Sequence, residues 1–188
     1  VYDVANLSNK GFSERIVTGP FSPLGHDTHI PSKNATHFAL PTNMPIAPFR
    51  EQKPENLEQL MHDIYHYVYI TDSEEGLIVV NVDTLADAES RNNFLKRDLT
   101  WNEDGILAGA QHINIAGHHA YILTKTDLVI LDLDDPLSPK FVNKISFNDP
   151  KAIEIQFRYA FVVDADGFHS VDVTDKDKIQ KVASVKLE

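Results

Sequence analysis

One short pattern occurs three times in this chain and constrains the fold more than any other feature. Each copy has an aromatic-centred apolar run, a tight polar turn, and a second apolar run that ends in Asn or Asp. β-Branched and aromatic residues bounded by turn formers predict a β-hairpin in each copy. The runs are centred on Tyr69, Tyr121 and Phe161, and they end at Asn81, Asp132 and Asp172.

The repeated polar residue at the end of each hairpin has a structural explanation. A short Asp or Asn side chain accepts backbone N–H bonds in the turn that follows it. We therefore expect this role for Asn81, Asp132 and Asp172, rather than a catalytic one. A fourth copy begins the chain, with Asp3 at the repeated position.

Two further strands complete each unit. Apolar runs precede the hairpins at residues 111–115 and 152–155, and others follow at 140–145 and 180–185. Four short strands in about 40 residues predict the blades of a β-propeller. A parallel α/β fold would need amphipathic helices between the strands, and the sequence leaves no room for them.

The spacing of the repeats divides the chain into blades. From Asp132 to Asp172 is 40 residues, but Asn81 to Asp132 is 51, which indicates an insertion of about eleven residues around 86–93. Asp3 to Asn81 is 78, which indicates a longer insertion. One insertion, at 54–65, has the apolar stripe of a short amphipathic helix. We predict the end of a preceding blade at 1–22, a blade with this helical insertion at 23–100, and further blades at 101–147 and 148–188. Since closed propellers have about 4–8 blades, these roughly three and a half blades indicate part of a larger protein or an assembly.

Composition excludes several classes of partner. The net charge of −11 repels nucleic-acid phosphate and anionic lipid. No apolar run approaches the ~18 residues that suggest a membrane span. The chain has no cysteine, so it has no disulfide and no covalent c-type haem site.

Histidines are the candidate metal ligands. His37 and His112 align on the first strands of two predicted blades, which line the channel of a propeller, and His26 and His29 lie in a preceding loop. Convergent neutral imidazoles bind copper, zinc or iron. The alternative is that water and backbone groups satisfy these rings. His118 and His119 fall at a hairpin turn and are expected to be exposed.

Two other patterns carry less chemistry. Residues 164–167 begin like a calcium loop, but Asp-Gly between strands favours a hairpin turn. The sequence contains no catalytic triad, paired-carboxylate cleft or phosphate loop, so we predict no catalytic residues.

The apolar strings 76–80, 127–132 and 167–172 resemble LVIVD repeats. Segments 29–31, 39–42, 92–97, 104–107 and 156–162 also resemble large bacterial proteins in which LVIVD propellers accompany multihaem c-type cytochrome segments. The resemblance implies an exported, periplasmic or cell-surface protein associated with electron transfer. Any haem must lie on another segment or another chain.

These observations favour a non-catalytic propeller module that binds protein partners or the remainder of its own polypeptide, with a multihaem cytochrome as one candidate partner. The alternative is a metal-dependent propeller oxidoreductase that uses His26, His29, His37 and His112. A purely structural adhesion or assembly domain is a third hypothesis. The alignment also predicts that Tyr121→Ala and Phe161→Ala destabilise strongly and that His169→Ala does not. Strand alternation, however, places His169 on the face of Val171, which makes His118→Ala the better control.

Overall fold

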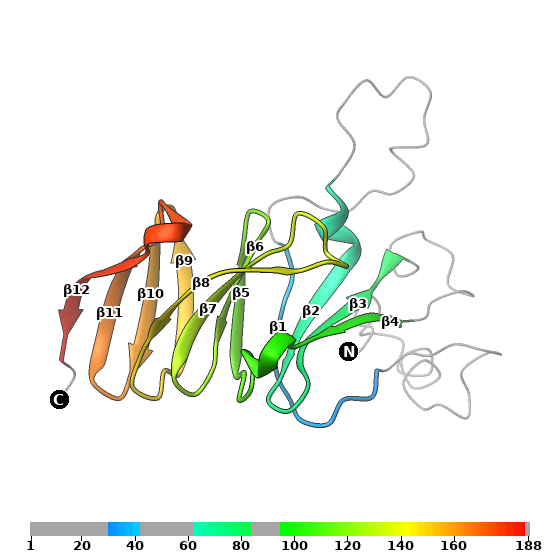
Figure 1. Cartoon of the computed structure of the whole chain (residues 1–188), viewed down its shortest axis with the longest axis horizontal. Coiled ribbons are helices and arrows are strands. Elements are labelled where there is room, and N and C mark those ends of the chain that lie inside the picture. Colours follow the sequence, from blue (N-terminus) through cyan, green and yellow to red (C-terminus); the bar gives the residue numbers. More distant parts are fainter. Residues whose placement is uncertain (1–29, 42–61, 84–94, 187–188) are drawn as a thin grey trace, which may run out of the picture.

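The chain folds into three antiparallel sheets, each built from four strands that are consecutive in sequence (Figure 1). The computed structural model describes residues 30–41, 62–83 and 95–186. The first sheet contains β1 (Ala35–Ala39), β2 (Tyr67–Asp72), β3 (Gly76–Asn81) and β4 (Lys96–Trp101). The second contains β5 (His112–Ala116), β6 (His119–Leu123), β7 (Asp127–Asp132) and β8 (Lys140–Ser146). The third contains β9 (Ala152–Gln156), β10 (Tyr159–Asp164), β11 (Gly167–Asp172) and β12 (Gln180–Val185).

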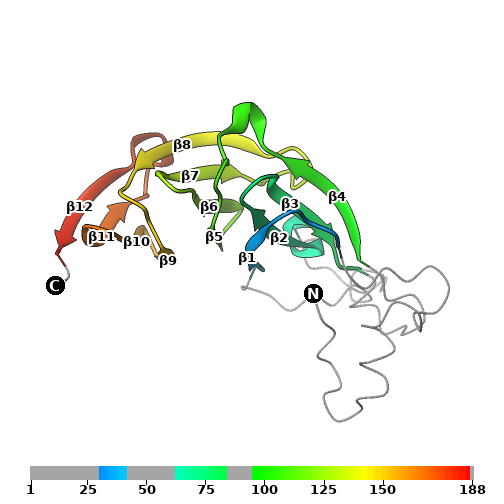
Figure 2. The ribbon, with the colours of Figure 1, turned by 90° about the horizontal axis from the view of Figure 1, so that it is seen from below.

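The three sheets stand side by side in an arc (Figure 2). The first strands, β1, β5 and β9, lie on its concave side, and the last strands, β4, β8 and β12, lie on its convex side. This arrangement confirms the all-β fold with propeller-like blades of four strands. Hereafter the sheets are called the first, second and third blade.

Helical structure is limited to single turns in the described residues. Three 3₁₀ turns occur, η2 (Asp63–His66), η4 (Glu103–Gly105) and η5 (Lys176–Lys178). Of the helix predicted at 54–65, residues 54–61 lie outside the described part, and η2 occupies its end. The predicted fourth repeat with Asp3 and the insertion near 86–93 lie outside it as well. No helix in the described part is long and apolar enough to cross a membrane.

The core lies between neighbouring blades. Strand alternation directs one face of each sheet towards the next blade. Tyr69 and Leu77 of the first blade pack with Ile113 and Ile122 of the second. Tyr121, Leu128 and Ile130 of the second blade pack in turn with Ile153, Ala160 and Val171 of the third. Tyr69 is 0% exposed and Tyr121 is 2% exposed.

Phe161 occupies the equivalent position in the third blade. It pairs with Ser170 as Tyr121 pairs with Ile130. The sequence predicted the same deep burial, but Phe161 is only half-buried, because no further blade follows in the described part of the chain. It stacks instead on Phe168, with ring centroids 5.8 Å apart.

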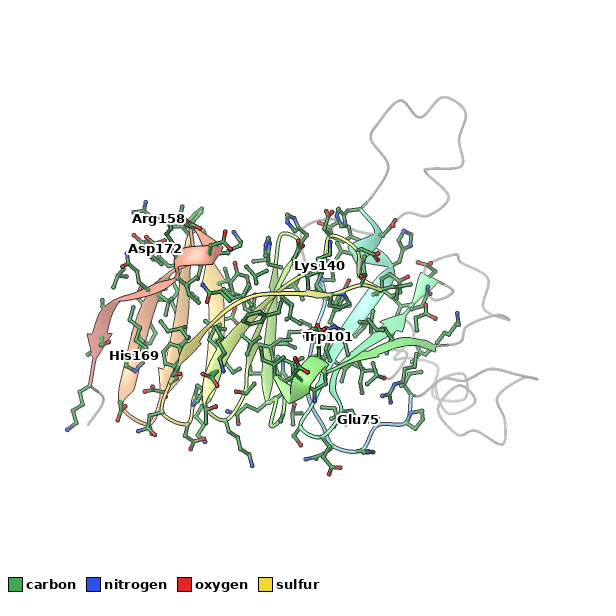
Figure 3. All side chains as sticks on the ribbon, viewed as in Figure 1. Glu75, Trp101, Lys140, Arg158, His169 and Asp172 are labelled. Carbon is green, nitrogen blue, oxygen red and sulfur yellow. The ribbon has the colours of Figure 1, made fainter. Side chains whose placement is uncertain are left out.

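His169 also differs from the first expectation. It lies in β11 (Figure 3), on the face that packs against the second blade and opposite to the face of Phe161. Its side chain is only 6% exposed. Its Nε2 lies 2.7 Å from Asp164 Oδ1, and its Nδ1 lies 2.7 Å from the hydroxyl of Ser184. Its ring and that of Phe147 pack edge to face, with centroids 5.5 Å apart. The alternation argument correctly grouped His169 with Val171. The burial of His169 argues against the prediction that His169→Ala does not destabilise strongly.

The repeated Asn and Asp residues act as turn acceptors. Asp132 Oδ1 accepts the N–H of Asp134, and Asp172 Oδ1 accepts that of Thr174, both at 2.9 Å. Asn81 Oδ1 accepts the N–H of residue 83 at 3.0 Å. Each side chain therefore closes the turn that leads out of the third strand of its blade.

Candidate functional site

A pocket of about 430 Å³ lies on the concave side of the arc, against the first strands of all three blades. His37 lies opposite Thr71 in the first blade, and His112 lies opposite Leu123 in the second. These two registers are equivalent, since each histidine stands two residues before the partner of the buried tyrosine. The third blade has Ala152 at this position. The sequence therefore places one imidazole at the same height on each of two neighbouring blades.

The structure brings His37 and His112 into direct contact. Their rings stack, with centroids 3.8 Å apart and planes inclined by 25°. The Nδ1 atoms of both rings are buried without a hydrogen-bond partner, and no other buried side-chain N or O atom of the described residues shares this property. Because a buried polar atom without a protein partner costs free energy unless another group satisfies it, these two nitrogens are the atoms that a bound ligand could contact.

Electrostatics favour the neutral form of His112. Burial, and next the neighbouring His37, lower the pKa of His112, while Glu154 acts in the opposite direction. Glu154 comes from β9 and accepts a 2.8 Å hydrogen bond from the side chain of Asn114. A neutral imidazole has a free lone pair, so His112 can serve as a ligand or as a proton acceptor.

The structure describes two of the four histidines of the predicted metal site. His37 and His112 come together, whereas His26 and His29 lie outside the described residues. Glu154 lines the same pocket, but the described part of the chain does not gather it with both imidazoles into a three-ligand group. The pocket therefore presents two nitrogen ligands, with a carboxylate nearby.

The calcium-like segment is a turn. It joins β10 to β11, and Asp164 Oδ1 accepts the backbone N–H groups of Asp166 and Gly167 at 2.8 and 3.1 Å. The same carboxylate contacts His169. Its oxygens are therefore engaged in holding the hairpin.

Sequence reasoning missed a second histidine cluster. His118, His119 and Asp132 bring three ligand atoms within 4.8 Å of one another at one end of the second blade. Burial, and next His118 and Lys176, lower the pKa of His119 to about 4, while Asp132 opposes this shift. The sequence does contain two adjacent histidines at the start of one strand and an aspartate at the end of the next. Only the register of these two strands shows that the three side chains meet.

The fold and these sites define a propeller-like module with histidine clusters on its concave side and at one end of its second blade. Residues 66–86 and 109–146 match the LVIVD repeat, so the chain carries LVIVD repeats in its first two described blades. Among solved structures, the crystal structure of the N-terminal domain of Nup159 is similar, with a TM-score of 0.46 and 14% sequence identity. The similarity covers 87% of this chain and 44% of that chain, so this chain spans less than half of that domain. No curated protein matches the sequence.

Proposed function

We propose that this chain is a non-catalytic propeller module that binds a protein partner, and that a further β-blade covers the outward face of its third blade. The observation that carries the proposal is the apolar face at Phe161. Phe168 is 38% exposed and stacks on Phe161, and Val185, which is 60% exposed, lies opposite Phe168 on the neighbouring strand β12.

Continuity with the other blades favours a blade as the occupant. The face of the first blade that carries Tyr69 is covered by the second blade, and the face that carries Tyr121 is covered by the third. Phe161 occupies the same register on the third blade. A sheet with a small-residue and β-branched face, like that of Ala120 and Ile122, fits such a surface.

Single-cysteine protection tests this proposal, because the chain contains no native cysteine. Ser170→Cys places a thiol on the outward face, opposite Phe161. Ala165→Cys places one in the exposed turn between β10 and β11. In the protein as its host produces it, we expect Ser170→Cys to react with a maleimide at least ten-fold more slowly than Ala165→Cys. Equal rates would overturn the proposal.

We further propose that the module belongs to an exported protein associated with multihaem c-type cytochromes. The support is the resemblance of segments 29–31, 39–42, 92–97, 104–107 and 156–162 to such proteins. Covalent c-type haem attachment needs cysteines, and this chain has none, so the haem belongs to another segment or chain. Sequencing the complete gene and its neighbours tests this: without Cys-x-x-Cys-His motifs or an export signal, the cytochrome proposal fails.

A metal-dependent oxidoreductase is the second candidate. The stacked His37 and His112, with their buried and unpartnered Nδ1 atoms, favour it. Elemental analysis of metal-replete wild-type and His112→Ala protein tests it. The candidate requires at least one equivalent of copper, zinc or iron that His112→Ala loses, and less than about a tenth of an equivalent in the wild type removes it.

A further inference from the structure

Two imidazoles and one carboxylate lie together where β6 begins and β7 ends, which is the end of this strand pair away from the β6–β7 turn. His119 lies directly opposite Asp132 in the strand pairing, and His118 precedes it in the turn. His118 Nε2 lies 3.8 Å from Asp132 Oδ1, and the rings of His118 and His119 have centroids 4.3 Å apart. The ligand atoms of all three residues lie within 4.8 Å of one another.

Neither of the other two blades has a histidine at the position of His119, and the third blade has none at the position of His118 either. Tyr67 lies opposite Asn81 in the first blade, and Tyr159 lies opposite Asp172 in the third, each at the position of His119. Nevertheless the same backbone bond closes all three turns. The N–H of Leu133 donates to the His118 carbonyl at 2.7 Å, and the corresponding bonds, to the carbonyls of His66 and Arg158, are 3.0 and 2.9 Å long.

The second blade therefore departs from its own repeat by replacing an aromatic residue with a metal-ligating one. Two imidazole nitrogens and a carboxylate oxygen suit divalent late first-row metals, in particular Zn²⁺ and Cu²⁺. Ligands at about 2.1 Å from a metal lie roughly 3.4 Å from one another in a tetrahedral site. The 3.8 Å separation between His118 and Asp132 is close to this value, and the His118 side chain is 46% exposed and free to adjust.

We propose that His118, His119 and Asp132 bind one divalent late first-row transition metal ion at this end of the second blade. Asp132 is already oriented for this role, because its Oδ1 accepts the N–H of Asp134. Three protein ligands leave a coordination position open to solvent or to a partner's side chain. Lys176 of the third blade lies across the same open cleft as His119, and its positive charge limits the affinity for the ion.

The chain's own repeats supply the test variants. His119→Tyr introduces the residue of the neighbouring blades, and Asp132→Asn introduces the residue at position 81, which keeps the turn acceptor. His66→Ala is the matched control, because His66 holds the turn position of His118 in the first blade, where Tyr67 rather than a second histidine follows it.

Metal-free full-length protein is titrated separately with Zn²⁺ and Cu²⁺ by calorimetry, with melting temperatures measured in EDTA as a check on folding. We expect one equivalent bound by the wild type and by His66→Ala, and at least ten-fold weaker binding by His119→Tyr and Asp132→Asn, with unchanged melting in EDTA. Lys176→Ala is expected to tighten binding. In electron paramagnetic resonance of the Cu²⁺ form, nitrogen hyperfine coupling should indicate two imidazoles in the wild type and one in His119→Tyr.

Three results would overturn the proposal. The first is a wild-type protein that binds neither ion. The second is equal affinity of wild type, His119→Tyr and Asp132→Asn. The third is binding that His112→Ala abolishes and His119→Tyr preserves, which would place the metal in the concave pocket and support the oxidoreductase alternative instead. Failure of the cysteine-protection experiment leaves this proposal untouched, since the two surfaces are different.

Discussion

Tyr121 and Phe161 hold the same position in successive blades but have different surroundings. Tyr121 is 2% exposed because the third blade covers it, whereas Phe161 is half-buried and rests on Phe168 of its own sheet. The repeat sets which residue points out of the sheet on this side, and the neighbouring blade sets whether that residue is buried. Position in a repeat is therefore a poor measure of stability until the next blade is known.

The largest expected difference in stability is between Tyr121→Ala and Phe161→Ala, which remove the two equivalent aromatic side chains. Removing a fully buried aromatic side chain costs about 3–5 kcal/mol, so we expect that loss from Tyr121→Ala. In the 188-residue chain by itself, Phe161→Ala removes half-buried area and is expected to cost roughly 1 kcal/mol. In a protein whose further blade covers this face, the loss should approach that of Tyr121→Ala. Urea denaturation of both variants measures the difference. Equal losses would mean that Phe161 is covered in solution.

His169 tests whether the inward face of the third blade behaves as core. His169→Ala removes the partner of the buried Asp164 carboxylate and the contact with Phe147, at an expected cost of about 1–3 kcal/mol. His118→Ala, an exposed histidine, should stay within about 0.5 kcal/mol of the wild type in EDTA. If both variants melt like the parent, the His169–Asp164 contact does not contribute to stability.

Acid should weaken the contact between Asp164 and His169 on the inward face of the third blade. Burial alone would raise the pKa of Asp164, but hydrogen bonds from His169 and from the backbone of Asn148 and Asp166 outweigh it and hold the pKa below its ordinary 3.8. A lowered folded-state pKa stabilises above the unfolded value and is lost as pH falls through the folded one. We therefore expect the free energy of unfolding to decline as the pH falls below about 4, and to decline less steeply in Asp164→Asn. Parallel pH profiles of the two proteins would contradict this assignment.

The smallest expected effect concerns the turn before each second strand. Gly117 in the second blade has φ +60°, and Phe157 holds the corresponding position in the third blade with φ +54° and 94% exposure. A non-glycine residue in this left-handed region is strained. Phe157→Gly should relieve that strain and leave stability unchanged or raised by up to about 1 kcal/mol, as measured by thermal melting. A marked loss of stability would show that the Phe157 ring makes a contact that its exposure does not reveal.

The strands and turns of the fold could be predicted from the sequence, because the pattern that defines a β-hairpin lies within a few consecutive residues. The alternation around Tyr69, Tyr121 and Phe161 fixes which side chains share a face, and the recurring Asn or Asp fixes the turns. The helix predicted at 54–65 stays a prediction for residues 54–61, which lie outside the described part of the chain. Where the structure describes its end, the chain forms the single turn η2.

The sequence predicted some of the residues of the candidate sites but not the distances between them. His37 and His112 could be aligned from the strand repeat, but their 3.8 Å stacking depends on how closely two blades approach at the concave side. To predict the cluster of His118, His119 and Asp132, one must know which residues of β6 and β7 lie opposite each other. The sequence alone did not give that register.

By itself, the sequence determined the number of strands in each blade, their order, and the residues that face a neighbour, because these follow from local alternation and turn chemistry. Only the tertiary structure decided that Tyr121 is buried and Phe161 half-exposed, and that His169 pairs with Asp164. It also decided that, among the described histidines, His37 with His112 and His118 with His119 form two separate clusters. Burial and convergence depend on groups far apart in the chain, and such distances are set by the packing of whole blades rather than by any local pattern.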